Sequence, residues 1–299
     1  TILESGTGAD GLQRAVADVL ARDAPIGFHA EQHAAAAVVE HRRQRMHRGA
    51  LLAGAALELQ RLRFAGGGEG VELFGRGHRG WRRGSGQGLF DEGVGEVGLH
   101  GLLRGEALRL RGMTAIPESE QWAAACIDFV ETRADLDAGM TGMLAWSLGG
   151  YYGPRATAFE PRIKFCVAWG ANYDWGQVQL KRLAMQGDRP VPHYWEHVRW
   201  VWGAKDMDDF LAKAEHMHLN GVLDRIRVPF LVTHGENDRQ IPLKYAHQSY
   251  EQLVNSPKKD LFIFTEREGG VEHSSLDNPN NAGNQIADWL AEQLGGTLA

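Results

Sequence analysis

The chain has few cysteines and no long apolar run. Its 299 residues include two Cys, Cys126 and Cys166, and each lies within a short apolar stretch. Two thiols are too few for a disulfide framework, so we expect buried free thiols in a reducing compartment and predict a cytoplasmic protein. No window approaches the roughly 18 consecutive apolar residues of a membrane-spanning helix, and the first residues show no signal-type stretch. We therefore expect no membrane partner.

Net positive charge is missing too. The chain carries 32 Lys plus Arg against 38 Asp plus Glu, a formal net charge of -6, which gives no reason to expect a nucleic-acid partner. Its 43% hydrophobic residues and nine Trp are enough for the sizeable core of a globular protein. We predict that its partner is a small-molecule substrate. Association into a homodimer stays open at this point.

Lysine is absent before Lys164, and the first part of the chain has its own composition. Good helix formers fill residues 8–22 and 29–64, whereas residues 66–112 contain 16 Gly, a density that opposes a packed core. We predict an N-terminal region over residues 1–112, first helical and then rich in Gly and Arg. Such a composition also arises when GC-rich DNA is translated in a shifted frame, a hypothesis that translation of the source DNA in all frames tests.

Residues 113–299 show a different pattern, in which apolar strands alternate with amphipathic helices. This alternation predicts an α/β fold with a mostly parallel sheet. Between the second and third strands, about residues 172–227 are rich in Trp, His and charge, and an insertion of that length predicts a helical lid. A polar turn is expected at residues 135–139. The expected strands are 142–146, 163–169, 229–233 and 261–265, and the expected helices are 119–133, 150–159, 243–254 and 282–294.

A serine stands where the first of these strands meets the next helix, in the sequence AWSLGG at residues 145–150. A nucleophile at a sharp strand-to-helix turn needs small residues two positions before and after it, and Ala145 and Gly149 meet this need. The first position is usually Gly, so Ala145 is a mild departure. The alternative is that Ser147 only caps the helix. We favour the nucleophile of an α/β-hydrolase fold.

A serine nucleophile needs a base and an acid, and both follow later strands in the order Ser, acid, His that this fold uses. The third strand leads into HGENDRQIP at residues 234–242, and the fourth leads into GGVEHSS at 269–275. We predict Ser147 as nucleophile, His273 as base and Asp238 as the acid that orients it. Glu236 is the rival acid.

The tetrahedral oxyanion of such a reaction needs two hydrogen-bond donors. The backbone N–H of Leu148 is the first candidate, because it follows the nucleophile at the start of a helix. The second donor normally comes from a loop after an earlier strand. No run before residue 112 resembles a buried parallel strand followed by such a loop.

Two pairs of histidines raise the question of a metal site. His193 and His197 are four residues apart, and His216 and His218 are two apart. No Cys lies near either pair, and a lid rich in Trp has structural uses for His. We therefore predict no metal ligands and no cofactor.

Three segments resemble a branch of the α/β-hydrolase superfamily that includes the 2,6-dihydroxypseudooxynicotine hydrolases and the FrsA-like esterases. They are WSLGGYYGPRA at residues 146–156, AWGANYDWG at 168–176 and VPFLVTHGEND at 228–238. The resemblance covers about residues 105–299. It implies a hydrolase core behind a helical N-terminal region that helps to cover the active site, with the triad on Ser147, Asp238 and His273.

The resemblance also implies an activity. The named hydrolases cleave a carbon–carbon bond in a ketone side chain of a pyridine ring, and an additional Glu between nucleophile and acid is thought to assist. The nearest equivalent here is Gln177, with Asp174 close by, so this chain departs from that pattern. Carbon–carbon hydrolysis is the first hypothesis and a carboxylesterase of FrsA type the second. An inactive or non-catalytic protein with this fold is a third, from another class.

Overall fold

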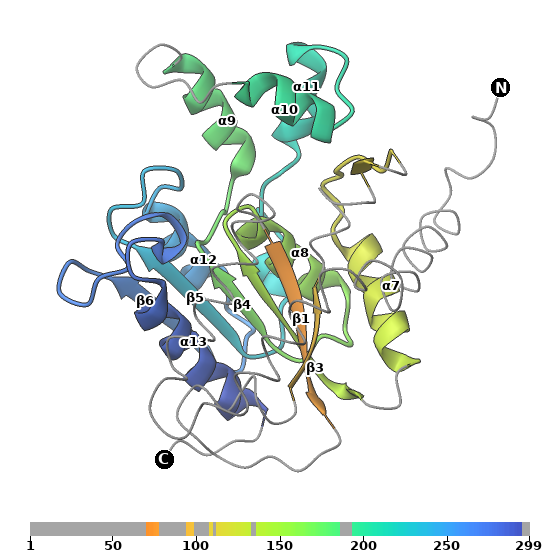
Figure 1. Ribbon diagram of the computed structural model, residues 1–299, viewed down its shortest axis with the longest axis vertical. Coiled ribbons are helices and arrows are strands. Elements are labelled where there is room, and N and C mark those ends of the chain that lie inside the picture. The colour runs from red at the N-terminus through yellow and green to blue at the C-terminus, as the bar shows by residue number, and fades with distance from the viewer. Residues whose placement is uncertain are drawn as a thin grey trace, which may run out of the picture.

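The computed structural model of the chain describes residues 70–77, 94–98, 108–109, 112–132, 136–185 and 193–294. The strands in these ranges form one sheet in the order β2-β1-β3-β4-β5-β6 (Figure 1). The last four are parallel, β1 is antiparallel to both its neighbours, and the result is the predicted mostly parallel α/β sheet. The strands are β1 (Gly70–Gly77), β2 (Val94–Gly98), β3 (Leu136–Trp146), β4 (Cys166–Trp169), β5 (Phe230–Gly235) and β6 (Lys259–Phe264).

The two faces of the sheet belong to two hydrophobic clusters. On β3, Met143 and Ala145 contribute to one cluster, while Leu144 and Trp146 contribute to the other, as the period of two along a strand requires. The first cluster includes residues of α7, α8 and α12, and the second includes residues of α13. These helices are α7 (Glu120–Glu131), α8 (Gly149–Phe159), α12 (Lys244–Gln252) and α13 (Pro279–Gln293).

Both cysteines lie in the first cluster as fully buried free thiols, as predicted. Burial raises the pKa of the Cys166 thiol to about 12 and also raises that of Cys126. Thiolate is the reactive form of cysteine, so neither side chain is a nucleophile at neutral pH.

One predicted turn is wrong. Residues 136–139 belong to β3 instead of forming a turn, because β1 pairs with Leu136 and Asp137 as well as with the apolar part of the strand, and residues 138–140 form an irregularity between the two paired parts. Arg76 lies opposite Asp137 after a register shift between Gly75 and Arg76. A neighbouring strand can satisfy the backbone N–H and C=O groups of a polar segment as well as those of an apolar one. The pattern of hydrophobic residues therefore could not predict this extension of the strand.

The Gly- and Arg-rich part of the chain contributes β1 and β2 to the sheet, which we did not predict. These strands pair antiparallel, so they need no buried apolar run of the kind that marks a parallel strand. The boundary at residue 112 stays a prediction. The helices predicted over residues 8–22 and 29–64 lie outside the described residues.

In the described residues between β4 and β5, three α-helices occupy the segment where the sequence predicts a helical lid. Figure 1 shows them grouped beyond one end of the sheet, as α9 (Trp175–Ala184), α10 (Tyr194–Val201) and α11 (Met207–Glu215). Trp175 stacks on Trp202 with 5.4 Å between ring centroids, and the edge of Phe210 meets Trp175 at 5.8 Å. All three rings are buried, so these aromatic residues form the core of the helical group. No helix within the described ranges is long and apolar enough to cross a membrane.

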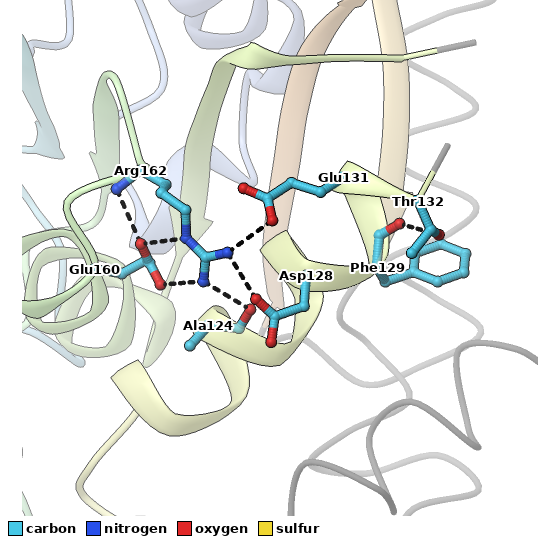
Figure 2. A network of polar contacts seen from close by, with 7 residues as sticks. All are labelled: Ala124, Asp128, Phe129, Glu131, Thr132, Glu160 and Arg162. Carbon is cyan, nitrogen blue, oxygen red and sulfur yellow. Dashed lines mark hydrogen bonds and ion pairs between the residues drawn. The ribbon is translucent and has the colours of Figure 1, made fainter. Parts of the chain in front are cut away.

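A charged network fixes α7 to the turn that leads into β4 (Figure 2). The Arg162 guanidinium donates to both carboxylate oxygens of Glu160, at 2.9 and 2.8 Å, and to Asp128 at 2.6 Å. It also reaches Glu131 and the carbonyl oxygen of Ala124. Partial burial favours the neutral form of Glu160, but the hydrogen bonds from Arg162 outweigh this and lower the pKa of that carboxyl. We call these residues the Arg162 network.

Candidate active site

Ser147 lies on a sharp turn between β3 and α8. Its φ of 59° is in the left-handed region, which is uncommon for a residue with a side chain. The Ser147 N–H donates to Trp169 O of β4 at 3.0 Å. A β-carbon at Gly150 would lie 2.0 Å from Gly170 O, so only glycine lets the first turn of α8 approach the end of β4 this closely.

The departure at Ala145 has a structural explanation. A β-carbon at Gly153 would lie 2.7 Å from the Ala145 methyl group. The space that the usual glycine would leave in the strand is thus supplied by a glycine in α8 instead. The local sequence alone could not show this, because Ala145 lies in β3 and Gly153 lies in α8, eight positions further along the chain.

Three side chains meet at the carboxyl ends of β3 and β5 and in the loop after β6. Ser147 Oγ lies 2.8 Å from His273 Nε2, and His273 Nδ1 lies 2.8 Å from Asp238 Oδ2. The Asp238 side chain has no exposed surface, and that of His273 is 12% exposed. If the carboxylate accepts the Nδ1 proton, the other ring nitrogen is free to accept the hydroxyl proton of Ser147.

The second oxygen of Asp238 is held by the backbone. Its Oδ1 accepts the N–H groups of Gln240 at 2.8 Å and Ile241 at 2.9 Å. Burial alone would raise the pKa of Asp238, but the hydrogen bonds from His273 and Ile241 and the charges around it lower it overall. The carboxyl is therefore ionised at neutral pH. Glu236 instead accepts the N–H of Glu266 at 2.7 Å, and no hydrogen bond or ion pair joins these two described residues, Glu236 and His273.

A second histidine supports the acid loop and was not singled out from the sequence. His234, in β5, is 1% exposed, and its Nε2 lies 3.0 Å from Ile241 O and 3.8 Å from Asp238 Oδ2. Burial, the largest influence, lowers the pKa of His234, so the ring is neutral and its Nε2–H donates to Ile241 O. Its position at the start of the segment that carries Asp238 was the one feature of the sequence that could have pointed to this role.

The described residues contain the first predicted oxyanion donor, the Leu148 N–H, but no loop of the kind that normally supplies the second. Leu148 precedes α8, and its N–H makes no hydrogen bond to another described residue. On the side of β3 away from β4 lies β1, whose first residue, Gly70, pairs with Trp146. Because β1 is antiparallel, it enters the sheet at this edge instead of leaving it. A loop after a parallel strand is therefore not found beside Ser147 among the described residues.

The two auxiliary candidates are not brought to the triad. Asp174 caps α9, because its carboxylate accepts the N–H of Gln177 at 2.9 Å, and Gln177 itself is exposed. Neither side chain has a hydrogen bond or ion pair with Ser147, His273 or Asp238 in the part of the chain that the structure describes. Their local pattern is that of a helix cap.

The histidine pairs of the lid also have local partners. His193 lies 3.1 Å from Glu196, and His218 Nδ1 accepts the N–H of Asn220 at 3.3 Å. Within the described ranges, no three His, Cys, Asp or Glu side chains are placed to hold a metal ion.

A serine on a left-handed turn after a parallel strand, with its histidine and aspartate in loops after later strands, defines this architecture. The chain has the α/β-hydrolase fold. A solved structure titled 2,6-dihydroxy-pseudo-oxynicotine hydrolase superimposes with a TM-score of 0.55 at 20% identity, over 77% of this chain and 66% of the other. Parts of the chain outside the triad loops thus follow the same fold.

Comparison with curated proteins agrees with this fold. It is 25% identical over 211 residues to 2,6-dihydropseudooxynicotine hydrolase of Paenarthrobacter nicotinovorans, covering 69% of this chain and 52% of that protein. It is 24% identical over 222 residues to hydrolase acrC of Aspergillus aculeatus, covering 64% and 52%. No family model matches. The chain spans about half the length of these relatives, and the resemblance stated from its residues is confirmed.

Proposed function

We propose that this chain is a serine hydrolase that acts on a small carbonyl compound through Ser147, His273 and Asp238. The observation that carries the proposal is the unbroken series of two 2.8 Å contacts from Ser147 Oγ through the His273 ring to Asp238. An ionised, fully buried carboxylate at one end and a hydroxyl on a strained turn at the other are what activation of a serine requires.

The reaction follows from this arrangement. The Ser147 oxygen bonds to the substrate carbonyl carbon while its proton passes to His273 Nε2, and Asp238 stabilises the imidazolium. The negative charge on the former carbonyl oxygen is stabilised by the Leu148 N–H. His273 then gives its proton to the departing atom, which leaves an acyl group on Ser147. Water then gives a proton to His273 as it attacks this acyl group, and His273 passes that proton to the Ser147 oxygen as the acid is released.

For the substrate, we propose a ketone whose side chain is cleaved at a carbon–carbon bond. The similarity to 2,6-dihydropseudooxynicotine hydrolase supports this proposal, together with the activity that the resemblance implies. In this case the departing atom is carbon, so His273 must protonate a carbanion as it leaves.

Ester hydrolysis is the second candidate, and one observation favours it. The position nearest the expected auxiliary Glu holds Gln177, which is exposed, while the carboxylate of Asp174 is engaged in capping α9. An alkoxide is a better leaving group than a carbanion and needs less assistance from an additional acid.

A fluorophosphonate probe followed by mass spectrometry tests the nucleophile. The wild-type protein should carry the adduct on Ser147, and Ser147→Ala should lose it together with at least about 10³-fold of the turnover. Ser256→Ala is the matched control, because the hydrogen-bond partners of Ser256 Oγ are Val228 O and Lys258 O, neither of which belongs to the triad. A folded wild-type protein without an adduct would favour the non-catalytic hypothesis.

Substrate screening separates the two reactions. Purified protein is offered short-chain nitrophenyl esters and aryl β-diketones under the same conditions. Turnover of diketones supports carbon–carbon cleavage, whereas rapid turnover of esters with none of the diketones contradicts it. Reaction without cofactor, cytoplasmic location, a homodimer and a covering role for the helical lid stay proposals from the sequence.

A further inference from the structure

The loop that carries His273 has an unusual backbone. Gly269 and Gly270 have φ of 72° and 91°, and Ser274 and Ser275, directly after the histidine, have φ of 50° and 55°. Two consecutive residues with side chains in the left-handed region are strained, at roughly 1–3 kcal/mol each. Such a conformation persists only where its surroundings hold it.

The carboxylate of Asp277 accepts hydrogen bonds from three backbone N–H groups of this loop. Asp277 Oδ2 accepts the N–H of Gly270 at 2.8 Å and of Val271 at 3.1 Å, and its Oδ1 accepts the N–H of Glu272 at 2.9 Å. These are the three residues directly before His273. Three successive backbone N–H groups around one anion form a compact nest. Partial burial opposes ionisation, but these bonds prevail and lower the pKa of Asp277.

The same loop also contacts the acid loop. The N–H of Asn237, next to Asp238, donates to Val271 O at 3.0 Å. A β-carbon at Gly235 would lie 2.3 Å from the same carbonyl oxygen, so the two loops approach each other as closely as glycine allows. The backbone that Asp277 fixes is thus the backbone that sets the histidine against its acid.

We propose that Asp277 is a positioning residue, which holds residues 270–272 so that the His273 ring lies within hydrogen-bond distance of both Ser147 and Asp238. It acts through His273 and touches no substrate. The proposal rests on the proposed function for its effect on rate, but not for its effect on the ring. Neither the nucleophile motif nor the resemblance pointed to this residue.

Two measurements on a graded series of variants test it. Asp277→Asn keeps one acceptor oxygen and adds a donor that faces the N–H groups, and Asp277→Ala removes both oxygens. The first readout is the rate of fluorophosphonate labelling at saturating probe. The second is the downfield proton NMR resonance of the hydrogen bond between His273 Nδ1 and Asp238. Asp288→Asn is the matched control, since it removes the same charge from an exposed position of α13.

We expect labelling to slow about 30- to 100-fold in Asp277→Ala and less in Asp277→Asn, since a displacement of about 1 Å can cost 10²-fold. The probe concentration for half-maximal rate should change little, and the resonance should shift or broaden in the same order. Asp288→Asn should match the wild type in both. If Asp277→Ala does not fold, Asp277→Asn carries the test.

Two outcomes are decisive. A folded Asp277→Ala or Asp277→Asn with wild-type labelling and an unchanged resonance would overturn the proposal. Suppose instead that no protein is labelled, the wild type included, while the resonance in the Asp277 variants still differs from that of the wild type. This result would overturn the hydrolase function and support the positioning role of Asp277.

Discussion

The molecule contains two polar networks of contrasting construction. At the carboxyl edge of the sheet, Ser147, His273 and Asp238 are largely buried and joined by single contacts. Before the amino end of β4, the Arg162 network joins one guanidinium to three carboxylates, two of which are about half exposed. The triad is a chain in which one hydrogen bond joins each neighbouring pair of side chains, whereas a single guanidinium makes all five hydrogen bonds at the centre of the Arg162 network.

Backbone strain gathers at the first network, and two of the buried polar atoms without a hydrogen-bond partner in the described chain lie beside it. Four non-glycine residues in the described ranges have a positive φ. Three of them, Ser147, Ser274 and Ser275, belong to or directly follow the triad residues, and the fourth is His193. His234 Nδ1 and Ser274 Oγ, beside the triad, are buried without a hydrogen-bond partner in the described chain. Each such feature destabilises the fold by about 1–3 kcal/mol, and such features concentrate where chemistry is done. The Arg162 network shows neither, which indicates a structural role.

Asp238→Asn should have the largest effect and breaks the first network only. An amide donates to His273 Nδ1 and leaves the proton on Nε2, where the ring can no longer accept the Ser147 hydroxyl proton. We expect turnover to fall about 10⁴-fold with little loss of stability. Steady-state kinetics and urea unfolding measure both. Glu236→Gln is the control, and a larger loss there than at Asp238 would reverse the assignment of the acid.

Arg162→Leu should have the opposite profile. It leaves Glu160, whose side chain is 6% exposed, without its charged partner, so we expect the free energy of unfolding to fall by about 1–3 kcal/mol. The rate per folded molecule should stay at the wild-type value, because no atom of this network contacts the triad. Glu131→Gln, at the exposed rim, should change stability by less than about 1 kcal/mol. A fall in rate without a fall in stability would contradict this prediction, because it would show that the Arg162 network contributes to catalysis.

His234→Gln should have the smallest effect and concerns pH. The pKa of folded His234 is lowered by burial, which is opposed by Asp238 and reinforced by His273 and His247. Below about pH 6.5 the unfolded chain therefore binds a proton that the folded chain does not. Stability from this group is present above that pH and is lost as the pH falls, by at most about 1.4 kcal/mol per pH unit.

Glutamine keeps a donor for Ile241 O and does not titrate, so this variant should lose less stability than the wild type between about pH 7 and pH 5.5. Urea unfolding at the two pH values gives the comparison, and Asp238 does not disturb it, because its lowered pKa keeps the carboxyl ionised throughout this range. Equal losses in the two proteins would show that His234 is protonated in the folded state.

Much of the fold could be predicted from residue patterns. Apart from the start of β3, six residues earlier than expected, the four parallel strands and the helices around them lie within a few residues of their expected positions, because an apolar run or a helical period is a local property. Strands β1 and β2 could not be predicted, since backbone pairing makes little demand on side chains. The turn at residues 135–139 failed for the same reason.

For the site, the sequence by itself determined the candidates: a serine at a strand-to-helix junction and, in the right order, a carboxylate and a histidine after later strands. It favoured Asp238 over the rival Glu236, two residues before it, without showing which of the two side chains contacts the histidine. That choice depends on which side chain reaches His273, 35 positions along the chain. Contacts between loops from different strands are fixed by the packing of the whole sheet. Only the tertiary structure therefore showed the contact of Asp238 with His273, the antiparallel neighbour of the nucleophile strand and the carboxylate of Asp277 around the histidine loop.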